Sequence, residues 1–256
     1  MRSSVFSALF GAMSNEHRID ISANNLANVN TTGFKRDNCA FQDTFQRFAH
    51  DSIVDAKPFI RDKNMLPAPK ILARPRLSEE VIDMSQGAFQ KTGNPLDLAI
   101  RGDGFFKVQK DGGEFLTRAG VFSLSPEGVL ITEQGYPVMA NGGEVSVPPR
   151  SDVVIDAEGV ITADGQEIAQ LDFVQPADTK ALKKQGENLY IVEGGEEVPA
   201  EGEIVQGYIE KSNVEVVNEM VAMIECQRSF EMYQKMISTT DQLDQKVIQQ
   251  VGRAQM

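Results

Sequence analysis

The feature that most constrains the fold is the C-terminal stretch, in which no Gly or Pro occurs from Tyr208 to Val251. Its apolar residues recur at intervals of 4, 3, 7 and 7 and so share one helical face: Val216, Met220, Met223, Phe230 and Ile237. Ser212 and Glu215 have the spacing of a capping box and predict the start of this helix, and Gly252 predicts its end. A helix of about 40 residues is roughly 60 Å long. Such helices usually pack against other long helices rather than on one compact domain.

The N-terminal end of the chain predicts a second helix. Its apolar residues recur at intervals of 4, 3, 7, 4 and 3, interrupted on that face by Glu16: Val5, Leu9, Ala12, Ile19, Ala23 and Leu26. A second apolar strip, formed by Phe6, Phe10 and Met13, flanks the first. Two apolar faces on one helix need more than one partner surface, because a single domain surface rarely covers both.

The middle of the chain has the pattern of an antiparallel β domain. From about residue 85 to 210, short apolar or alternating runs such as "FFKVQ", "VFSLS" and "LDFVQ" are separated by the turn signals "DGG", "PEG" and "NGG". Residues 37 to 84 contain four prolines and lack sustained periodicity, which predicts an extended arm with one short helix at residues 41 to 48. We therefore expect an α+β fold in four segments: an N-terminal helix and joint (1–36), a connecting arm (37–84), an antiparallel β domain (85–210) and a C-terminal helix (211–256).

Charge excludes some classes of partner. The chain has 25 basic and 37 acidic side chains and a net charge of −12, which argues against nucleic acid or an anionic membrane. Residues 75 to 211 hold 24 acidic and 11 basic side chains, whereas both ends are nearly neutral. The N-terminus lacks the residue order of a secretory signal, so we expect a cytosolic protein or one that leaves without a cleaved signal. Cys39 and Cys226 are expected to be two independent thiols, with one bridge as the alternative.

No pattern in the sequence predicts an active site. His17 and His50 are the only histidines, so a three-histidine metal site is excluded and a Ser/His/Asp triad has little to draw on. No P-loop, nucleophile elbow or dinucleotide fingerprint occurs. We interpret the acidic loop at 193 to 203 as solvated rather than as a cation site. We therefore expect no catalytic residue, no metal, no cofactor and no small-molecule substrate.

A polar stretch, "DISANNLANVNTTGFKRD" at residues 20 to 37, comes directly after the N-terminal apolar pattern. Asn24 and Asn28 lie four residues apart on one helical face with Asn25 beside them, so their amides can bond backbone groups that a terminating helix leaves unpaired. Gly33 can take a positive φ where the path bends. The stretch predicts either an ordinary asparagine-rich helix end or a joint between the helix and the connecting arm.

The segment "ANNLANVNTTGFKR" resembles the N-terminal signature of the bacterial flagellar basal-body rod and hook proteins, the axial family. Three further segments are similar to internal and C-terminal parts of that family, in the same order: "LDLAIRGDGFFKV", "FLTRAGVFSLSPEGVLITEQGYPV" and "GYIEKSNVEVVNEMVAMIECQRSFEMYQKMI". The resemblance covers nearly the whole chain. The opening residues and the ending "DQKVIQQVG" are most similar to proximal rod proteins, with distal rod proteins as the alternative.

The resemblance implies a structural subunit of the hollow rod that crosses the periplasmic space, not an enzyme. It implies export by the flagellar type III apparatus, an inner coiled-coil layer of terminal helices, and other rod proteins and further copies of the chain as partners. On this basis Asn24, Asn25, Asn28 and Gly33 are expected to hold the joint. The expected helix contacts in the assembly are Val5, Leu9, Ile19 and Leu26 together with Val216, Met220, Met223, Ile224, Phe230 and Ile237.

The residues by themselves are compatible with two other functional classes. An enzyme would need a pocket with convergent polar groups. A non-flagellar helical scaffold would instead have a stable pair of terminal helices in the monomer and would not depend on export.

Overall fold

The computed structural model describes residues 2–45, 73–148 and 151–253. The chain divides into two compact units. The helical unit comprises Met1–Ala23, Asn38–Val81 and Met220–Met256, and the β unit comprises Asn24–Asp37 and Ile82–Glu219. A short N-terminal segment, residues 24 to 37, therefore belongs to the same unit as most of the strands, whereas the segment predicted from the sequence extends from residue 1 to 36.

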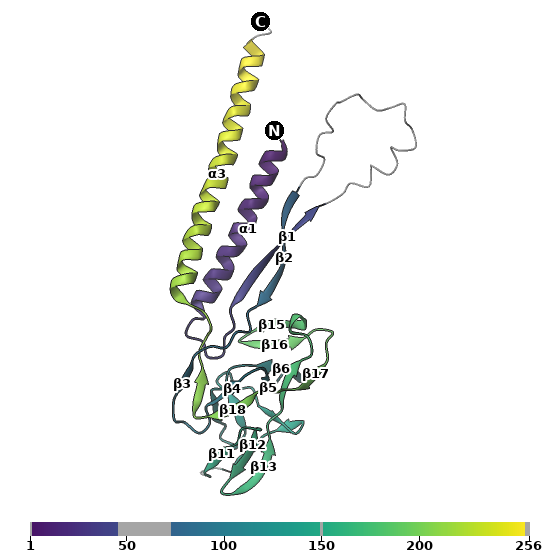
Figure 1. Cartoon of the computed structure of the whole chain (residues 1–256), viewed down its shortest axis with the longest axis vertical. Helices are drawn as coiled ribbons and strands as arrows, with labels where there is room; N and C mark the ends of the chain where they lie inside the picture. Colours follow the sequence, from purple (N-terminus) through teal and green to yellow (C-terminus); the bar gives the residue numbers. More distant parts are fainter. Residues whose placement is uncertain (1, 46–72, 149–150, 254–256) are drawn as a thin grey trace, which may run out of the picture. The chain divides into compact units, whose positions relative to one another are not determined.

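Two long helices dominate the helical unit. They are α1 (Arg2–Ala27) and α3 (Val216–Arg253), and they run side by side (Figure 1). The same unit contains most of β1 (Asp37–Phe45) and β2 (Ala73–Ile82), which pair as a two-stranded sheet. Both helices form where the apolar periodicity predicts them.

Three local predictions are wrong. The short helix expected at residues 41 to 48 is strand β1 as far as Phe45, and residues 46 to 48 lie outside the described residues. Pairing with the distant β2 decides this conformation, and local periodicity cannot reveal such a partner. The α3 helix begins at Val216 rather than at the expected capping box, because the Ser212 hydroxyl accepts a hydrogen bond from the Val214 N–H at 3.2 Å and closes a local turn instead. It also continues past Gly252, to Arg253.

The β unit consists of short antiparallel strands, as predicted. Its largest sheet has six strands in the order β15-β16-β6-β5-β14-β17, and β11, β12 and β13 form a three-stranded sheet. The remaining pairs are β18 with β4, β19 with β3, β7 with β8 and β10 with β9. The elements are β3 (Phe89–Lys91), β4 (Leu98–Arg101), β5 (Phe105–Lys110), β6 (Gly113–Thr117), β7 (Phe122–Leu124), β8 (Leu130–Thr132), β9 (Met139–Ala140), β10 (Gly143–Glu144), β11 (Val153–Ile155), β12 (Val160–Ala163), β13 (Gln166–Gln170), β14 (Phe173–Pro176), the 3-10 helix η1 (Thr179–Ala181), β15 (Leu182–Gly186), β16 (Leu189–Val192), β17 (Glu197–Pro199), β18 (Glu203–Gln206) and β19 (Tyr208–Glu210). With its two long helices and its antiparallel strands, the chain has the predicted α+β fold.

The β5–β6 hairpin shows how the turn signals work. Phe106 pairs with Thr117 at its open end, and Lys110 pairs with Gly113 beside the turn. The two turn residues between them, Asp111 and Gly112, have φ angles of 50° and 80°. Positive φ at both positions is what a two-residue type I′ turn requires, and it matches the twist of the strands that it joins.

One main hydrophobic core lies inside the β unit. Phe106 and Val108 of β5 are completely buried, and the Phe106 ring meets Phe122 edge to face with centroids 5.2 Å apart. The other buried members are Leu98, Ile100, Leu130, Val138, Ala140, Val145, Val147, Val153, Ile155, Ile161, Leu171, Leu189 and Ile204. They come from strands and from the segments between them throughout residues 98 to 204, so this core joins the smaller sheets to the six-stranded one.

The two cysteines are free thiols, which confirms the prediction. Cys226 is buried on α3, and burial raises the pKa of its thiol. No helix in the described ranges is long and apolar enough to cross a membrane.

Truncation of the core aromatic should destabilise the β unit strongly. We expect Phe106→Ala to lower the free energy of unfolding by about 3–5 kcal/mol, because it removes a buried ring and leaves a cavity. Val154→Ala is the control, since Val154 on β11 is 53% exposed and its truncation should cost less than about 1 kcal/mol. Chemical denaturation followed by circular dichroism measures both, and equal losses would contradict the assignment of the core.

Candidate assembly surfaces and chain junction

The buried face of α1 carries small and polar side chains: Ala8, Ala12, Asn15 and Ser22. The larger apolar residues of the predicted stripe are more accessible. Leu9 is 45% exposed and the neighbouring Met13 is 56% exposed, while Ile19 and Leu26 are half-buried. The side chain of Val5 lies outside the described residues. The chain therefore leaves part of the apolar surface of α1 without cover.

A longer exposed apolar surface extends along α3. We call it the α3 apolar surface, and its members are Val216, Val217, Met220, Val221, Ile224, Met232, Met236, Leu243, Val247 and Ile248, each between 40% and 70% exposed. Three predicted contact residues, Val216, Met220 and Ile224, belong to it, whereas Met223, Phe230 and Ile237 are half-buried. Exposed apolar side chains that gather on one element are typical of sites that contact another protein.

The asparagines of the predicted joint have different roles. Asn25 is almost fully buried, and its side-chain amide donates to the Asp37 carbonyl and accepts from the Asp37 N–H, both at 2.9 Å. Asn28 donates to the Asn24 carbonyl at 2.9 Å and accepts from the Thr31 hydroxyl at 3.1 Å. Asn25 thus ties the last turn of α1 to the first residue of β1, while Asn24 and Asn28 close the end of the helix.

Gly33 allows the chain to pass close to the β strands. Its φ is +69°, and a Cβ at this position would lie 2.4 Å from the Arg118 carbonyl oxygen. Its N–H donates to the Glu210 carbonyl at 2.8 Å. Only glycine combines this conformation with this approach at little cost.

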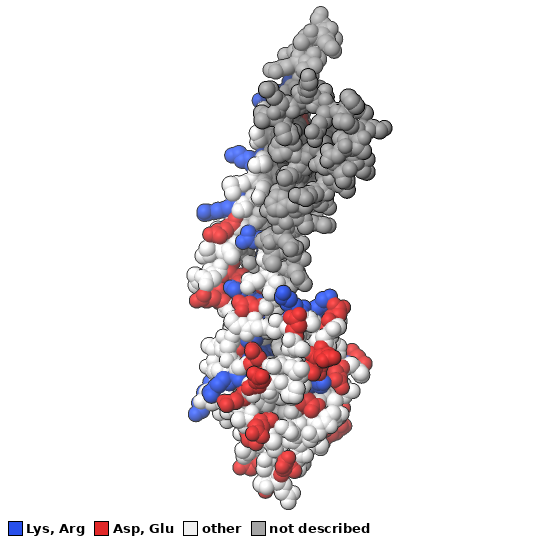
Figure 2. All heavy atoms as spheres, turned by 45° about the vertical axis from the view of Figure 1, so that its right-hand side comes forward, with Lys and Arg blue, Asp and Glu red and all other residues white. Residues whose placement is uncertain are grey.

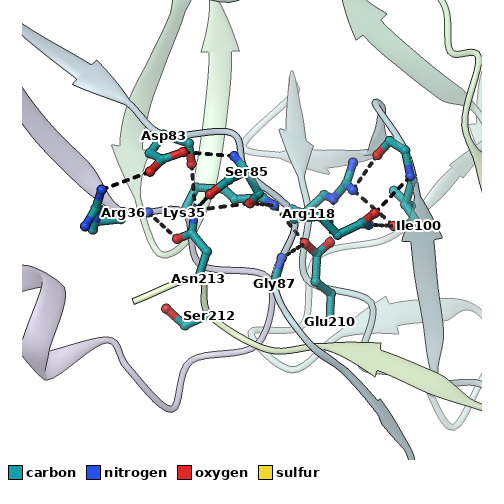
Figure 3. A network of polar contacts seen from close by, with 12 residues as sticks. Lys35, Arg36, Asp83, Ser85, Gly87, Ile100, Arg118, Glu210, Ser212 and Asn213 are labelled. Atoms are coloured by element: carbon teal, nitrogen blue, oxygen red, sulfur yellow. Dashed lines mark hydrogen bonds and ion pairs between the residues drawn. The ribbon is translucent and has the colours of Figure 1, made fainter. Parts of the chain in front are cut away.

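A buried ionic cluster lies directly after Gly33 (Figure 3). The Glu210 carboxylate accepts from Lys35 Nζ and Arg118 Nε, both at 2.7 Å, and from the Gly87 N–H at 2.8 Å. The side chains of Lys35, Arg118 and Glu210 are 2%, 5% and 1% exposed. The Arg118 guanidinium also donates to the carbonyls of Gly104, Ile100 and Gly102. Every charge in the cluster therefore has a charged partner, as burial requires.

Burial disfavours the charged form of Lys35 in this cluster. It lowers the pKa of the Lys35 ammonium below its ordinary value, and the adjacent Glu210 carboxylate opposes part of that shift. Removing one partner from a buried pair typically costs about 3–5 kcal/mol, because the remaining charge is left without compensation. The stability of the β unit therefore depends on the position of Lys35.

A second polar shell surrounds the cluster (Figure 3). Asn213 accepts from the Arg36 N–H at 2.7 Å and donates to the Asp83 carbonyl at 2.8 Å. The Arg36 guanidinium pairs with Asp83 at 3.1 Å and approaches Glu219, in the first turn of α3, at 3.7 Å. Burial acts to raise the pKa of Asp83, but hydrogen bonds from Ser85 and the pairing with Arg36 outweigh it, so this pKa is lowered.

Side chains of the β15–β16 hairpin also bind this segment. Lys184 donates to the Asp37 carboxylate at 2.8 Å, and its ammonium lies 4.0 Å from the centroid of the Phe34 ring. Asn188 donates to the Thr32 carbonyl at 2.8 Å. Residues 32 to 37 are therefore bound along their length by side chains of the β unit.

The ionic cluster was not predicted from the sequence. Lys35, Arg118 and Glu210 are far apart in the chain, and single charged residues carry no periodic signal. The only local hint is the run "TGFKRD", which places two cations directly after a conformationally special glycine. The fold, not the spacing, brings the three groups together.

The surface chemistry matches the charge pattern. Figure 2 shows Asp and Glu side chains spread over the visible face of the β unit, in agreement with the 24 acidic and 11 basic side chains of residues 75 to 211.

A cavity lined by Lys35 and Arg118 has a volume of about 140 Å³. It is smaller than typical ligand sites, which have volumes of roughly 300–1,000 Å³. Among the described residues, no group of three or more His, Cys, Asp or Glu side chains is arranged to hold a metal ion.

A matched pair of glycine substitutions can test the close passage at residue 33. Gly135→Ala should cost about 1 kcal/mol, because its φ is +88° and open space surrounds it. Gly33→Ala adds a collision with the Arg118 carbonyl and should cost about 1–3 kcal/mol more. Denaturant unfolding of both variants gives the comparison, and similar losses would mean that the backbone at Gly33 is free to move away.

Asp83 should make stability depend on acid pH. Its folded-state pKa lies below that of the unfolded chain, so its stabilising contribution is present above about pH 4 and is lost as the pH falls through the folded pKa. We expect Asp83→Asn to lower the free energy of unfolding at pH 7, with the difference from wild type shrinking below about pH 4. Denaturant unfolding at pH values from about 2 to about 7 measures this difference in stability, because that range spans ordinary carboxyl titration. A difference that stays constant with pH would contradict it.

Three known protein families match segments at both ends and in the middle of the chain. Residues 8–35 match the flagella basal body rod protein family, residues 99–163 match the flagellar hook protein FlgE/F/G D1 domain, and residues 205–250 match the flagellar basal body rod FlgEFG protein C-terminal family. The first match includes the joint and Lys35, and the third includes Glu210 and every member of the α3 apolar surface.

Similarity to single proteins extends over the full length. The flagellar basal-body rod protein FlgF of Caulobacter vibrioides is 34% identical over an alignment of 259 positions, which covers 99% of each chain. FlgG of Buchnera aphidicola (subsp. Schizaphis graminum) is 36% identical over 90% of this chain and 93% of its own. FlgG of Bacillus subtilis is 33% identical over 97% of this chain and 98% of its own. The chain therefore belongs to the flagellar basal-body rod protein family.

Proposed function

We propose that this protein is a structural subunit of the flagellar basal-body rod that polymerises through its terminal helices. The observation that carries the proposal is the α3 apolar surface, which leaves ten large apolar side chains 40–70% exposed along a helix of 38 residues. Leaving such a surface in water is unfavourable, and neighbouring subunits would cover it. Membership in the rod family supports another rod subunit as that neighbour.

The two terminal helices would form an inner coiled-coil layer, and the β unit would lie outside it. Charge supports this arrangement, because residues 212 to 256 carry four basic and six acidic side chains, whereas residues 75 to 211 carry 11 and 24. A nearly neutral, apolar helix suits burial between subunits, and an acidic surface suits contact with water. The contact residues would be those expected from the sequence, with Leu9, Val216, Met220 and Ile224 among the exposed ones.

The position in the rod would be proximal. Alignment with the Caulobacter FlgF covers 99% of both chains, which supports a protein of the same organisation. A distal rod protein is the second candidate, supported by 36% identity to the Buchnera FlgG over 90% of this chain. Both candidates are structural proteins rather than enzymes.

The partners would be other rod proteins and further copies of this chain. The flagellar type III apparatus would export the chain without a cleaved signal, and the rod would place it in the periplasmic space. Subunits of a rod stack head to tail in heterologous contacts, which extend a lattice rather than close a two-fold dimer.

A charge placed within the helix contacts should block incorporation into the rod. We expect Met223→Asp to abolish motility in a strain that lacks the chromosomal gene, because assembly would bury an unpaired carboxylate. The purified variant should keep the unfolding transition of the β unit, to which Met223 does not belong. Swimming in soft agar and electron microscopy of isolated basal bodies measure the outcome.

Gln242→Asp is the matched control, since it adds the same charge at an exposed polar position of α3 and should leave motility intact. Normal motility with Met223→Asp would overturn the proposed contact. Equal loss in both variants would show that added charge alone, at any place on the helix, prevents assembly.

A further inference from the structure

One contact between α1 and α3 depends on a glycine, Gly11, which has no side chain. A Cβ built on Gly11 of α1 would lie 2.5 Å from Cζ, 2.6 Å from Cε1 and 3.0 Å from Cε2 of Tyr233 on α3. Real Cβ atoms do not approach other heavy atoms so closely. The aromatic ring therefore lies directly against the backbone of Gly11 and fills the space that a side chain would occupy.

The surroundings of Gly11 make this a built contact. Ala8 and Ala12 are 2% and 6% exposed, so the helix on both sides of the glycine presents small, buried residues. Asn15 is 7% exposed, and its amide donates to the Gly11 carbonyl at 3.1 Å. This hydrogen bond satisfies a buried amide within α1 itself, so that the face needs no polar partner on α3.

We propose that Gly11 and Tyr233 set the register in which α1 packs against α3. Gly11 is the only glycine in α1, so a shift of one helical turn would bring the Tyr233 ring against a residue that has a Cβ. Small residues let two helices approach closely, and a ring that fits only one gap selects one alignment. Register in turn decides which apolar residues of each helix face outward and are available to other subunits.

The substitution Gly11→Ala separates this proposal from ordinary helix energetics by its sign. Alanine is the better helix former, so propensity alone predicts that the change protects α1. A register contact predicts the opposite, because the new methyl group expels the ring. We expect amide hydrogen exchange in residues 8 to 23 of the full-length chain to become about tenfold faster, since the ring is displaced from its place against Gly11.

A second substitution tests whether Tyr233 is the cause. In a Tyr233→Ala background the collision is gone, so Gly11→Ala should be neutral or protective there. Tyr233→Phe keeps the ring and should leave the effect of Gly11→Ala unchanged. Ser14→Ala is the matched control on α1, with a similar gain in helix propensity, and it should slow exchange or leave it unaltered in both backgrounds.

Each of the following outcomes either supports or overturns the proposed register contact. Reversal of the effect of Gly11→Ala by Tyr233→Ala supports the register contact. Slower exchange in Gly11→Ala alone overturns it, as does faster exchange that Tyr233→Ala fails to reverse. A wild-type α1 that exchanges as fast as an unfolded peptide also overturns it. The measurement uses the purified chain and does not require an assembled rod.

Discussion

The β unit depends on the buried carboxylate of Glu210. This group accepts hydrogen bonds from Lys35, Arg118 and the Gly87 N–H, which come from three separate parts of the chain. An unpaired charge inside a protein is very costly, so all three donors must be in place together. The glutamate therefore joins the N-terminal segment, the start of the β strands and the β6–β7 region into a single structure. Arg118 spreads the remaining positive charge over three backbone carbonyls.

Other polar contacts bind the last turn of α1 and the first turn of α3 within the β unit. The final turn of α1 belongs to this unit, and Asn25 binds it to Asp37, which Lys184 holds in turn. The first turn of α3 belongs to it as well, through Glu219 beside Arg36. The directional hydrogen bonds of this polar network specify one geometry for these turns.

Much of the architecture could be predicted from the sequence, because its causes are local. The 3.6-residue apolar period identified α1 and α3, and turn signals such as "DGG" identified the antiparallel domain through the positive φ that Asp111 and Gly112 adopt. The failures have different causes. Strand β1 forms where a helix was expected because the distant β2 pairs with it, whereas α3 starts late because Ser212 closes a local turn. Lys35, Arg118 and Glu210 left no signal because no spacing links residues so far apart.

The sequence by itself determined the two long helices and the acidic antiparallel domain, because periodicity, turn chemistry and composition act over a few residues. Its resemblance to rod and hook proteins also pointed to the family that the comparisons established. Only the tertiary structure decided that residues 24 to 37 are part of the β unit, that α1 buries its small face, and that Gly11 receives Tyr233. These features result from packing and from the pairing of buried charges, which depend on contacts between residues distant in the chain.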